Sequence, residues 1–288
     1  MIAEENRGLA IESTRLVGEG WNCIAYLVND ELIFRFPKRS GLWEELQREI
    51  AFLAFAADRL PLPVPRYERV SPESVAAPNG YAVYRYLPGD TLDADWLSPV
   101  EKDAAAAPIA MFLKALHTLE PASVITGSLP REDPRGESEK YLATAKRDIV
   151  PRLLSSEAKR LVELLELHLE DSQNFEGKAV VLHADLSSEH VLMKHGSIAG
   201  VIDFGDVNWG DADYDFMYLF VDCGETFADS VARHYGHRNP DRLKAKLRYF
   251  AVVDQLDTIV HGPGLSRKGQ EEAAWRRLRQ FIQPRNAI

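Results

Sequence analysis

Short runs of alternating apolar and polar residues fill the first ninety positions, a pattern typical of β-strands. Residues 16–28 indicate a strand, a glycine-containing turn and a second strand, and residues 31–38 and 80–87 indicate two more. Residues 42–60 differ, because their apolar side chains recur at helical spacing. The proline-rich segment 60–65 ends this helix, since proline removes a backbone donor and restricts the residue before it. The pattern predicts a small sheet with one helix.

From residue 88 onward, apolar positions follow helical spacing over most of the chain. The expected helices cover residues 101–119, 137–154, 156–169 and 247–261, with a further basic helix beyond residue 264. His117 falls near the end of the first of them, and we interpret it as a core or helix-end histidine. The C-terminal part of the chain is therefore expected to be mainly helical.

One segment interrupts the helical pattern with closely spaced polar residues. The apolar run Val180–Leu182 predicts a buried strand, a second apolar run covers residues 191–193, and a turn signal lies between that run and residues 200–202. The order strand, loop, strand, turn, strand predicts a hairpin. Such a hairpin would bring His190 and Asp203 side by side.

These polar residues have the chemistry that phosphoryl transfer requires. The reaction needs a carboxylate that orients the attacking hydroxyl and accepts its proton, and ligands that hold Mg²⁺ against nucleotide phosphates. Asp185 suits the first role, and His190 and Asp203 suit the second. The spacing matches the kinase-like pattern, in which His-x-Asp is followed by a fifth-position ligand and by Asp-Phe-Gly. Here His183 begins that pattern, and His190 stands where Asn is usual.

The sequence His-Ala-Asp-Leu-Ser-Ser-Glu-His-Val-Leu, followed by Gly-Val-Ile-Asp-Phe-Gly-Asp, resembles the aminoglycoside phosphotransferases, and within them the 2″-phosphotransferase branch. That branch also carries His at the fifth position after the catalytic Asp. Macrolide phosphotransferases share this His and are the nearest competitors. Ala184 departs from the Gly or Asn that is usual between the His and the Asp, a change that we expect to be mild.

The resemblance implies an α+β, two-lobed, protein-kinase-like fold. Residues 1–87 would form a nucleotide-binding lobe with a small antiparallel sheet and one helix, and residues 88–288 a mainly helical lobe with the catalytic loop, the metal site and the substrate pocket. Arg35 takes the position of the strand cation that pairs nucleotide phosphates, with Lys38 as the alternative. Glu49 falls where the family places the helix glutamate that pairs this cation.

Further nucleotide contacts are expected from backbone groups. In the family the strand that ends near residue 87 is the hinge whose N–H and C=O groups bind the base, which makes Tyr84, Tyr86 and Leu87 candidates. Gly18 and Gly20 would let the first hairpin lie close over the phosphates. The third glycine of the protein-kinase pattern is absent, and an ordinary hairpin explains these two glycines equally well.

Acidic residues follow the catalytic segment and would suit a cationic acceptor. The candidates for contacts with substrate amines are Asp206, Glu225, Asp254 and Asp257. Asp257 falls where the 2″ branch carries an acidic residue. We expect Asp211 and Asp215 to be structural, one capping a helix and the other holding the catalytic loop.

The overall composition narrows the class of partner and compartment. The net charge of −10 argues against nucleic acid and weakly favours a cationic ligand, although solubility alone explains it. No apolar stretch reaches the ~20 residues that a membrane helix needs, and residues 1–6 lack the basic start of a signal peptide. Cys23 and Cys223 build no disulfide framework. We expect a monomer in the cytoplasm that binds no nucleic acid and no membrane.

These observations favour transfer of the γ-phosphoryl group of ATP or GTP, with Mg²⁺, to a hydroxyl of an aminoglycoside, a reaction that would give antibiotic resistance. One alternative is the same chemistry on a macrolide or a metabolic alcohol, whose site should be more apolar. The other is a nucleotide-binding pseudokinase, against which the presence of both Asp185 and Asp203 argues.

Overall fold

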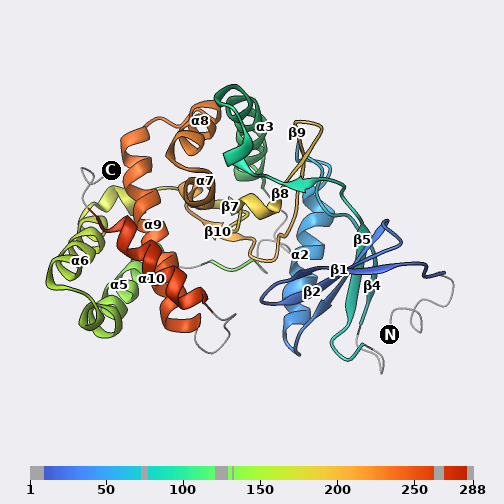
Figure 1. The fold of residues 1–288 in the computed structure, drawn as a ribbon, viewed down its shortest axis with the longest axis horizontal. Helices are drawn as coiled ribbons and strands as arrows, with labels where there is room; N and C mark the ends of the chain where they lie inside the picture. The colour runs from blue at the N-terminus through green and yellow to red at the C-terminus, as the bar shows by residue number, and fades with distance from the viewer. Residues whose placement is uncertain (1–9, 73–76, 121–128, 132, 263–268, 284–288) are drawn as a thin grey trace.

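The computed structural model describes residues 10–72, 77–120, 129–131, 133–262 and 269–283. An antiparallel sheet with one helix forms the N-terminal part, and helices dominate the remainder (Figure 1). The strands are β1 (Thr14–Glu19), β2 (Cys23–Val28), β3 (Leu32–Pro37), β4 (Tyr67–Ser71), β5 (Tyr81–Arg85), β6 (Asp90–Thr91), β7 (Val180–Leu182), β8 (Val191–Lys194), β9 (Ser197–Val201) and β10 (Asn208–Gly210).

The α-helices are α2 (Leu42–Ala56), α3 (Pro99–His117), α5 (Pro134–Thr144), α6 (Ser155–Glu170), α7 (Met217–Cys223), α8 (Glu225–Tyr235), α9 (Pro240–His261) and α10 (Gln270–Phe281). Short 3₁₀ turns cover η1 (Ala94–Trp96), η3 (Val150–Arg152), η4 (Ser172–Phe175), η5 (Ser188–His190) and η6 (Ala212–Phe216), and η2 (Ala145–Ile149) is a π turn. None of the helices within the described ranges is long and apolar enough to cross a membrane. The lobe boundary after Leu87 stays a prediction.

The N-terminal sheet has the strand order β1-β2-β3-β5-β4, and all of its pairs are antiparallel. Its central strand β3 pairs Arg35 with Ala25 on β2 and with Ala82 on β5. The charged side chain of Arg35 is consequently buried, with 8% of the residue exposed. Helix α2 lies beside the sheet and buries Glu49 on the same side (Figure 1).

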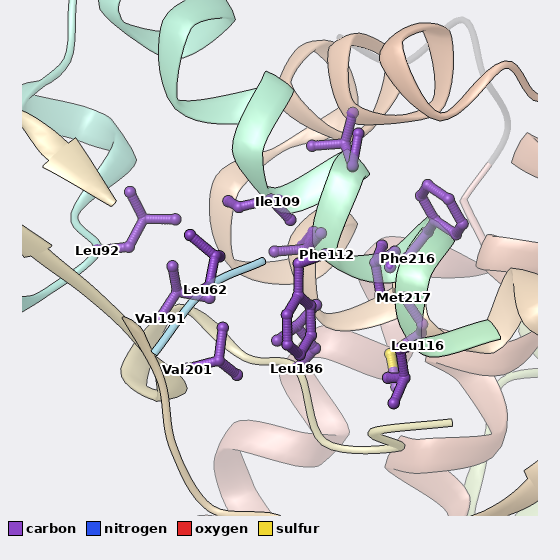
Figure 2. Close-up of a cluster of buried hydrophobic side chains, with 14 of the residues drawn as sticks. Leu62, Leu92, Ile109, Phe112, Leu116, Leu186, Val191, Val201, Phe216 and Met217 are labelled. Carbon is purple, nitrogen blue, oxygen red and sulfur yellow. The ribbon is translucent and has the colours of Figure 1, made fainter. Parts of the chain in front are cut away.

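The largest apolar core joins α2 to the helical part of the chain. Phe112 and Leu116 of α3 pack with Leu186 and with Val191 and Val201 of the β8–β9 hairpin (Figure 2). Helix α3 begins with a capping box between Ser98 and Glu101, which satisfies backbone donors at both residues. Pro108 lies inside this helix, which continues to His117. The core thus places the catalytic segment directly on α3.

Small strands frame the central loop, as the hairpin pattern predicts. Strand β8 pairs with β9 in an antiparallel hairpin, and β6 extends it to three strands. Strand β7 pairs with β10, which places Trp209 opposite Val181. Strands β6 and β10 were not expected from the sequence, because runs of two and three residues carry no measurable alternation. Helix α5 begins at Pro134, three residues earlier than expected, because Asp133 caps it and proline suits the first helical turn.

The β8–β9 hairpin is joined to the N-terminal part through backbone atoms. The N–H of Val201 donates to the carbonyl oxygen of Pro63 at 2.9 Å. A Cβ atom at Gly200 would lie 2.8 Å from that same oxygen, and one at Gly89 would lie 2.8 Å from the carbonyl oxygen of Met193. Glycine at 200 and 89 therefore allows backbones to approach more closely than a side chain would permit.

We predict that Gly200→Ala lowers the free energy of unfolding by about 1–3 kcal/mol, the usual cost of overpacking a close contact. The added methyl group would meet a backbone oxygen that cannot rotate away. Urea or guanidinium unfolding of both proteins, monitored by circular dichroism, measures the difference.

Gly177→Ala is the matched control, because a Cβ atom there would meet no described atom within 4 Å. Its stability should stay within about 1 kcal/mol of wild type. Equal stabilities for the two variants would show that the contact between Gly200 and Pro63 is not tight.

Candidate active site

The loop after β7 has a strained backbone that is held by a buried carboxylate. Ala184 has φ = +66°, in the left-handed region that favours glycine and asparagine. The carboxylate of Asp215 accepts the N–H of His183 at 2.9 Å and that of Ala184 at 2.8 Å. Asp215 therefore fixes the backbone immediately before Asp185, which is the structural role expected for it. Because the loop needs φ > 0 at residue 184, alanine there is more than a mild change.

The imidazole of His183 connects this loop to the second half of the site. Its Nε2–H donates to the carbonyl oxygen of Ile202 at 3.1 Å, and its Nδ1 accepts the N–H of Asp185 at 3.3 Å. Its ring also packs on Phe204, with centroids 4.6 Å apart. Burial lowers the pKa of His183 to about 4, so the ring stays neutral and keeps this donor and acceptor pattern.

The hairpin brings His190 and Asp203 together, as the sequence pattern predicts. The Nε2 atom of His190 lies 3.7 Å from Oδ2 of Asp203, and the N–H of Ile202 donates to the carbonyl oxygen of His190 at 2.9 Å. The Nδ1 atom of His190 donates to the carbonyl oxygen of Asp185 at 2.7 Å. Because a carbonyl only accepts, Nδ1 carries hydrogen, and the ring in its neutral form presents the Nε2 lone pair on the side of Asp203. Burial opposes the charged ring, but Asp185 and Asp203 raise the pKa of His190 above its usual value.

This pair would suit a metal ion whose remaining ligands would come from a nucleotide. Within the described ranges no group of three or more His, Cys, Asp or Glu side chains could hold a metal by itself. Mg²⁺ commonly binds through one or two protein groups together with substrate phosphates and water, and imidazole suits Mn²⁺ better. Burial opposes ionisation of Asp203, but Arg35 and His190 lower its pKa, so the carboxylate is charged and available.

Arg35 lies between the sheet, helix α2 and the Asp203 segment. Its Nη1 atom is 2.5 Å from Glu49 Oε1 and donates to the hydroxyl of Tyr67 at 3.0 Å. Its Nη2 atom donates to Oδ1 of Asp203 at 3.2 Å. Lys38, the alternative cation, instead pairs with Glu19 at 3.1 Å. The geometry therefore favours Arg35 as the cation of the site.

Burial alone would destabilise both charges of the Arg35–Glu49 pair. It works against the charge of Arg35, but Glu49 and its neighbours raise the pKa of Arg35 well above its usual value. Burial also raises the pKa of Glu49, and Arg35 opposes that change. The Tyr67 hydroxyl donates to Glu49 at 2.8 Å and supplies the second hydrogen bond that a buried carboxylate needs.

The backbone around Gly18 and Gly20 has few close neighbours, whereas the backbone at Tyr84 and Tyr86 is bonded to neighbouring segments. Cβ atoms at Gly18 and Gly20 would lie no closer than 3.8 Å to their nearest described neighbours, so the fold itself does not require glycine there. Tyr84 lies inside the sheet, paired with strands on both sides. The N–H of Tyr86 donates to the carbonyl oxygen of Glu31 at 2.8 Å. The N–H of Tyr86 is therefore already bonded, while its carbonyl oxygen and the backbone of Leu87 stay predicted contacts for the base.

Several neighbouring carboxylates raise the pKa of Asp185. Burial, together with Asp206 and Asp203, raises the pKa of Asp185 to about 7, while His190 opposes the change. Asp254 contributes in the same direction and accepts the hydroxyl of Tyr218 at 2.8 Å. A carboxylate with a pKa near 7 is suited to accept a proton at neutral pH.

The other two acidic candidates lie farther from Asp185 in the network of contacts. The charge of Asp257 raises the pKa of Asp254. The Oδ1 atom of Asp257 lies 3.8 Å from Nε2 of His261, one helical turn away. Glu225 pairs with Lys244 at 3.0 Å, and no contact among the described residues links it to Asp185. Its role in substrate binding stays a prediction that the geometry does not support.

Two tyrosines of the site were missed from the sequence. Tyr67 of β4 bonds to both members of the Arg35–Glu49 pair, and Tyr218 of α7 bonds to Asp254. Both contacts join residues from elements far apart in the chain, and neither tyrosine belongs to a motif with fixed spacing. Asp211 does cap a short helix, as expected, by accepting the N–H of Asp213 at 3.1 Å.

A family model described as "Phosphotransferase enzyme family" matches residues 13–247 of the chain. Solved structures of related proteins match the chain over almost its full length. The GDP and kanamycin complex of the aminoglycoside 2″-phosphotransferase APH(2″)-IIIa is 27% identical with a TM-score of 0.89, covering 98% of this chain and 96% of that one. The GDP complex of wild-type aminoglycoside 2′-phosphotransferase-IIIa is 26% identical with a TM-score of 0.90, covering 98% of this chain and 96% of that one.

A more distant structure, macrolide 2′-phosphotransferase type I, is 20% identical with a TM-score of 0.75, covering 96% of this chain and 94% of that one. At this identity the likeness concerns the fold alone. Together the matches confirm the kinase-like fold and the resemblance that the catalytic segment suggested.

We predict that Ala184→Gly stabilises the protein by about 0.5–1 kcal/mol, because glycine adopts φ = +66° without the penalty that a Cβ atom carries. Guanidinium unfolding of the variant and wild type measures the change.

Ala145→Gly is the matched control, since Ala145 is also buried but has φ = −57°. The same substitution there relieves no strain and should destabilise by about 1 kcal/mol or more. Destabilisation of similar size in both variants would show that Ala184 is not strained.

Proposed function

The chain belongs to the phosphotransferase enzyme family, and from this premise we propose that it transfers the γ-phosphoryl group of ATP or GTP to a hydroxyl of an aminoglycoside. The carboxylates around Asp185 are the observation that carries the choice of acceptor. Asp206 and Asp254 are close enough to alter its pKa, so the site presents negative charge to an incoming acceptor. An aminoglycoside, with several ammonium groups, would neutralise these carboxylates. A macrolide carries one amine and would leave most of them unpaired.

Asp185 would orient the acceptor hydroxyl and take its proton. Its side chain is 30% exposed and can therefore reach a ligand, while the loop behind it is fixed by Asp215. The hydroxyl oxygen forms the new bond to the γ-phosphorus, the bond to the bridging oxygen of the nucleoside diphosphate breaks, and the proton passes to Asp185. No covalent enzyme intermediate is needed.

The nucleotide would lie between the sheet and the hairpin. Arg35 would neutralise phosphate oxygens, Gly18 and Gly20 would allow close approach of the first hairpin, and Leu87 would contact the base. His190 and Asp203 would hold Mg²⁺, which when bound draws charge from the phosphate oxygens. The nucleotide complexes of the 26–27% identical enzymes support nucleotide binding on this fold.

The proposal is tested by measuring kcat/KM for a panel of aminoglycosides and macrolides with ATP and with GTP. We expect phosphorylation of at least one aminoglycoside, with an acceptor KM that rises steeply with salt because opposite charges attract across the site. Turnover of macrolides alone, or binding that does not depend on salt, would contradict the choice of acceptor.

Asp185→Asn should lower kcat by about 10²–10⁴-fold, because asparagine keeps the shape of the side chain and cannot accept the proton. Nucleotide affinity, measured by calorimetry, should remain close to that of wild type. If the variant turns over at nearly the wild-type rate, Asp185 is not the proton acceptor.

His190→Ala should raise the Mg²⁺ concentration that gives half-maximal rate, and His190→Asn should partly restore it because its side chain can still offer an oxygen ligand. His195→Asn is the matched control, since His195 is exposed at the turn of the same hairpin and should leave the metal dependence unchanged. An unchanged metal dependence in the alanine variant would mean that His190 is not a ligand.

A further inference from the structure

A buried histidine on α3 contacts the carboxylate that fixes the catalytic loop. The Nε2 atom of His117 lies 3.0 Å from Oδ2 of Asp215. The same carboxylate accepts the backbone N–H groups of His183 and Ala184. The side chain of His117 is 2% exposed and that of Asp215 is fully buried, so solvent cannot replace this hydrogen bond.

The hydrogen-bond pattern identifies which ring nitrogen of His117 donates and which one accepts. A carboxylate accepts and does not donate, so Nε2 of His117 carries the hydrogen that Asp215 receives. The other nitrogen, Nδ1, lies 3.0 Å from the hydroxyl of Tyr235 on α8. Burial raises the pKa of Tyr235, which keeps its hydroxyl protonated and able to donate to Nδ1. The tyrosine ring also packs edge-to-face on the imidazole, with centroids 5.6 Å apart.

Among the residues that the structure describes, Asp215 thus receives three hydrogen bonds, and only the one from His117 comes from a side chain. The two backbone donors belong to the loop that Asp215 must restrain, including the residue with φ = +66°. A carboxylate that holds a strained loop must itself be prevented from rotating, since otherwise the loop would relax along with it. His117 supplies this restraint from α3, a helix anchored in the main apolar core (Figure 2).

We propose that His117 is a positioning residue for catalysis, which acts through Asp215 to hold Asp185 in the orientation that accepts the substrate proton. Tyr235 supports it by setting the orientation of the imidazole ring. His117 does not touch the reacting atoms. Loss of its contact with Asp215 should therefore lower kcat and make the loop before Asp185 less ordered, while nucleotide affinity stays largely unchanged.

Substituting His117 by Gln or by Asn tests its contacts with Asp215 and Tyr235 separately, because each side-chain amide replaces a different ring nitrogen. In His117→Gln the amide nitrogen occupies the place of Nε2 and can still donate to Asp215. In His117→Asn the shorter amide occupies the place of Nδ1, near Tyr235, and does not reach Asp215. Both variants keep a buried polar group with a partner, so a difference between them reports on the Asp215 contact.

The first measurement is hydrogen exchange of the backbone amides of His183 and Ala184, which requires no substrate. In His117→Asn these amides should exchange about tenfold faster or more, because the carboxylate that accepts them has lost a charge-assisted bond. In His117→Gln they should exchange at close to the wild-type rate. Unchanged exchange in the asparagine variant overturns the inference, whatever the acceptor of the enzyme is.

The second measurement is the rate of phosphoryl transfer, and this half of the inference rests on the proposed function. His117→Asn should lower kcat by about 10- to 100-fold, the effect of misplacing a catalytic group by about 1 Å, with little change in nucleotide KM. His117→Gln should recover most of the rate. A wild-type enzyme that phosphorylates no tested acceptor would refute the proposed function, and the exchange experiment would still decide the role of His117.

Tyr249→Phe is the control for general loss of stability. It removes a buried hydrogen bond, from the Tyr249 hydroxyl to Ser138 at 2.7 Å, in a second apolar cluster away from the loop. If Tyr249→Phe lowers kcat as much as His117→Asn does, the effect of His117 is only structural and the inference is wrong.

Discussion

A buried guanidinium connects the two parts of this molecule. Arg35 extends from the centre of the sheet and bonds to Glu49 on α2 and to Asp203 after the hairpin. Desolvating a charge is costly unless every partner is well placed, so these three side chains must keep one arrangement. Because Asp203 also lies 3.7 Å from Nε2 of His190, the same cation that would meet phosphate oxygens helps to set the position of the proposed metal ligands. In the proposed function, nucleotide binding and metal binding would therefore both depend on this ionic cluster.

The catalytic loop is positioned in a different way, by acceptors for its backbone. Asp215 receives the N–H groups of two consecutive residues, and the carbonyl oxygen of Asp185 receives His190 Nδ1. His190 Nδ1 also lies 3.4 Å from Oδ2 of the Asp185 carboxylate, whose side chain is 30% exposed and can still meet a substrate hydroxyl. Fixing the backbone before Asp185 is a way to align a proton acceptor.

Local patterns explain what could be predicted from the sequence. The neighbourhood of His190 and Asp203 followed from two short strands and a turn, and the pairing of Arg35 with Glu49 followed from the family resemblance. Contacts between distant segments left no such signal. His117 meets Asp215 98 residues away, and its position on an apolar helix face looks like that of any core histidine. The charge of Glu225 gave no hint of its partner Lys244, because which helix faces meet is decided only by packing.

The backbone contact at Gly200 has a mechanical consequence. The N–H of Val201 is bonded to Pro63, and the chains there approach too closely for a side chain. Sliding of one lobe past the other would break that bond and drive the two backbones together. Rotation about the contact would do neither, so the close approach acts as a pivot.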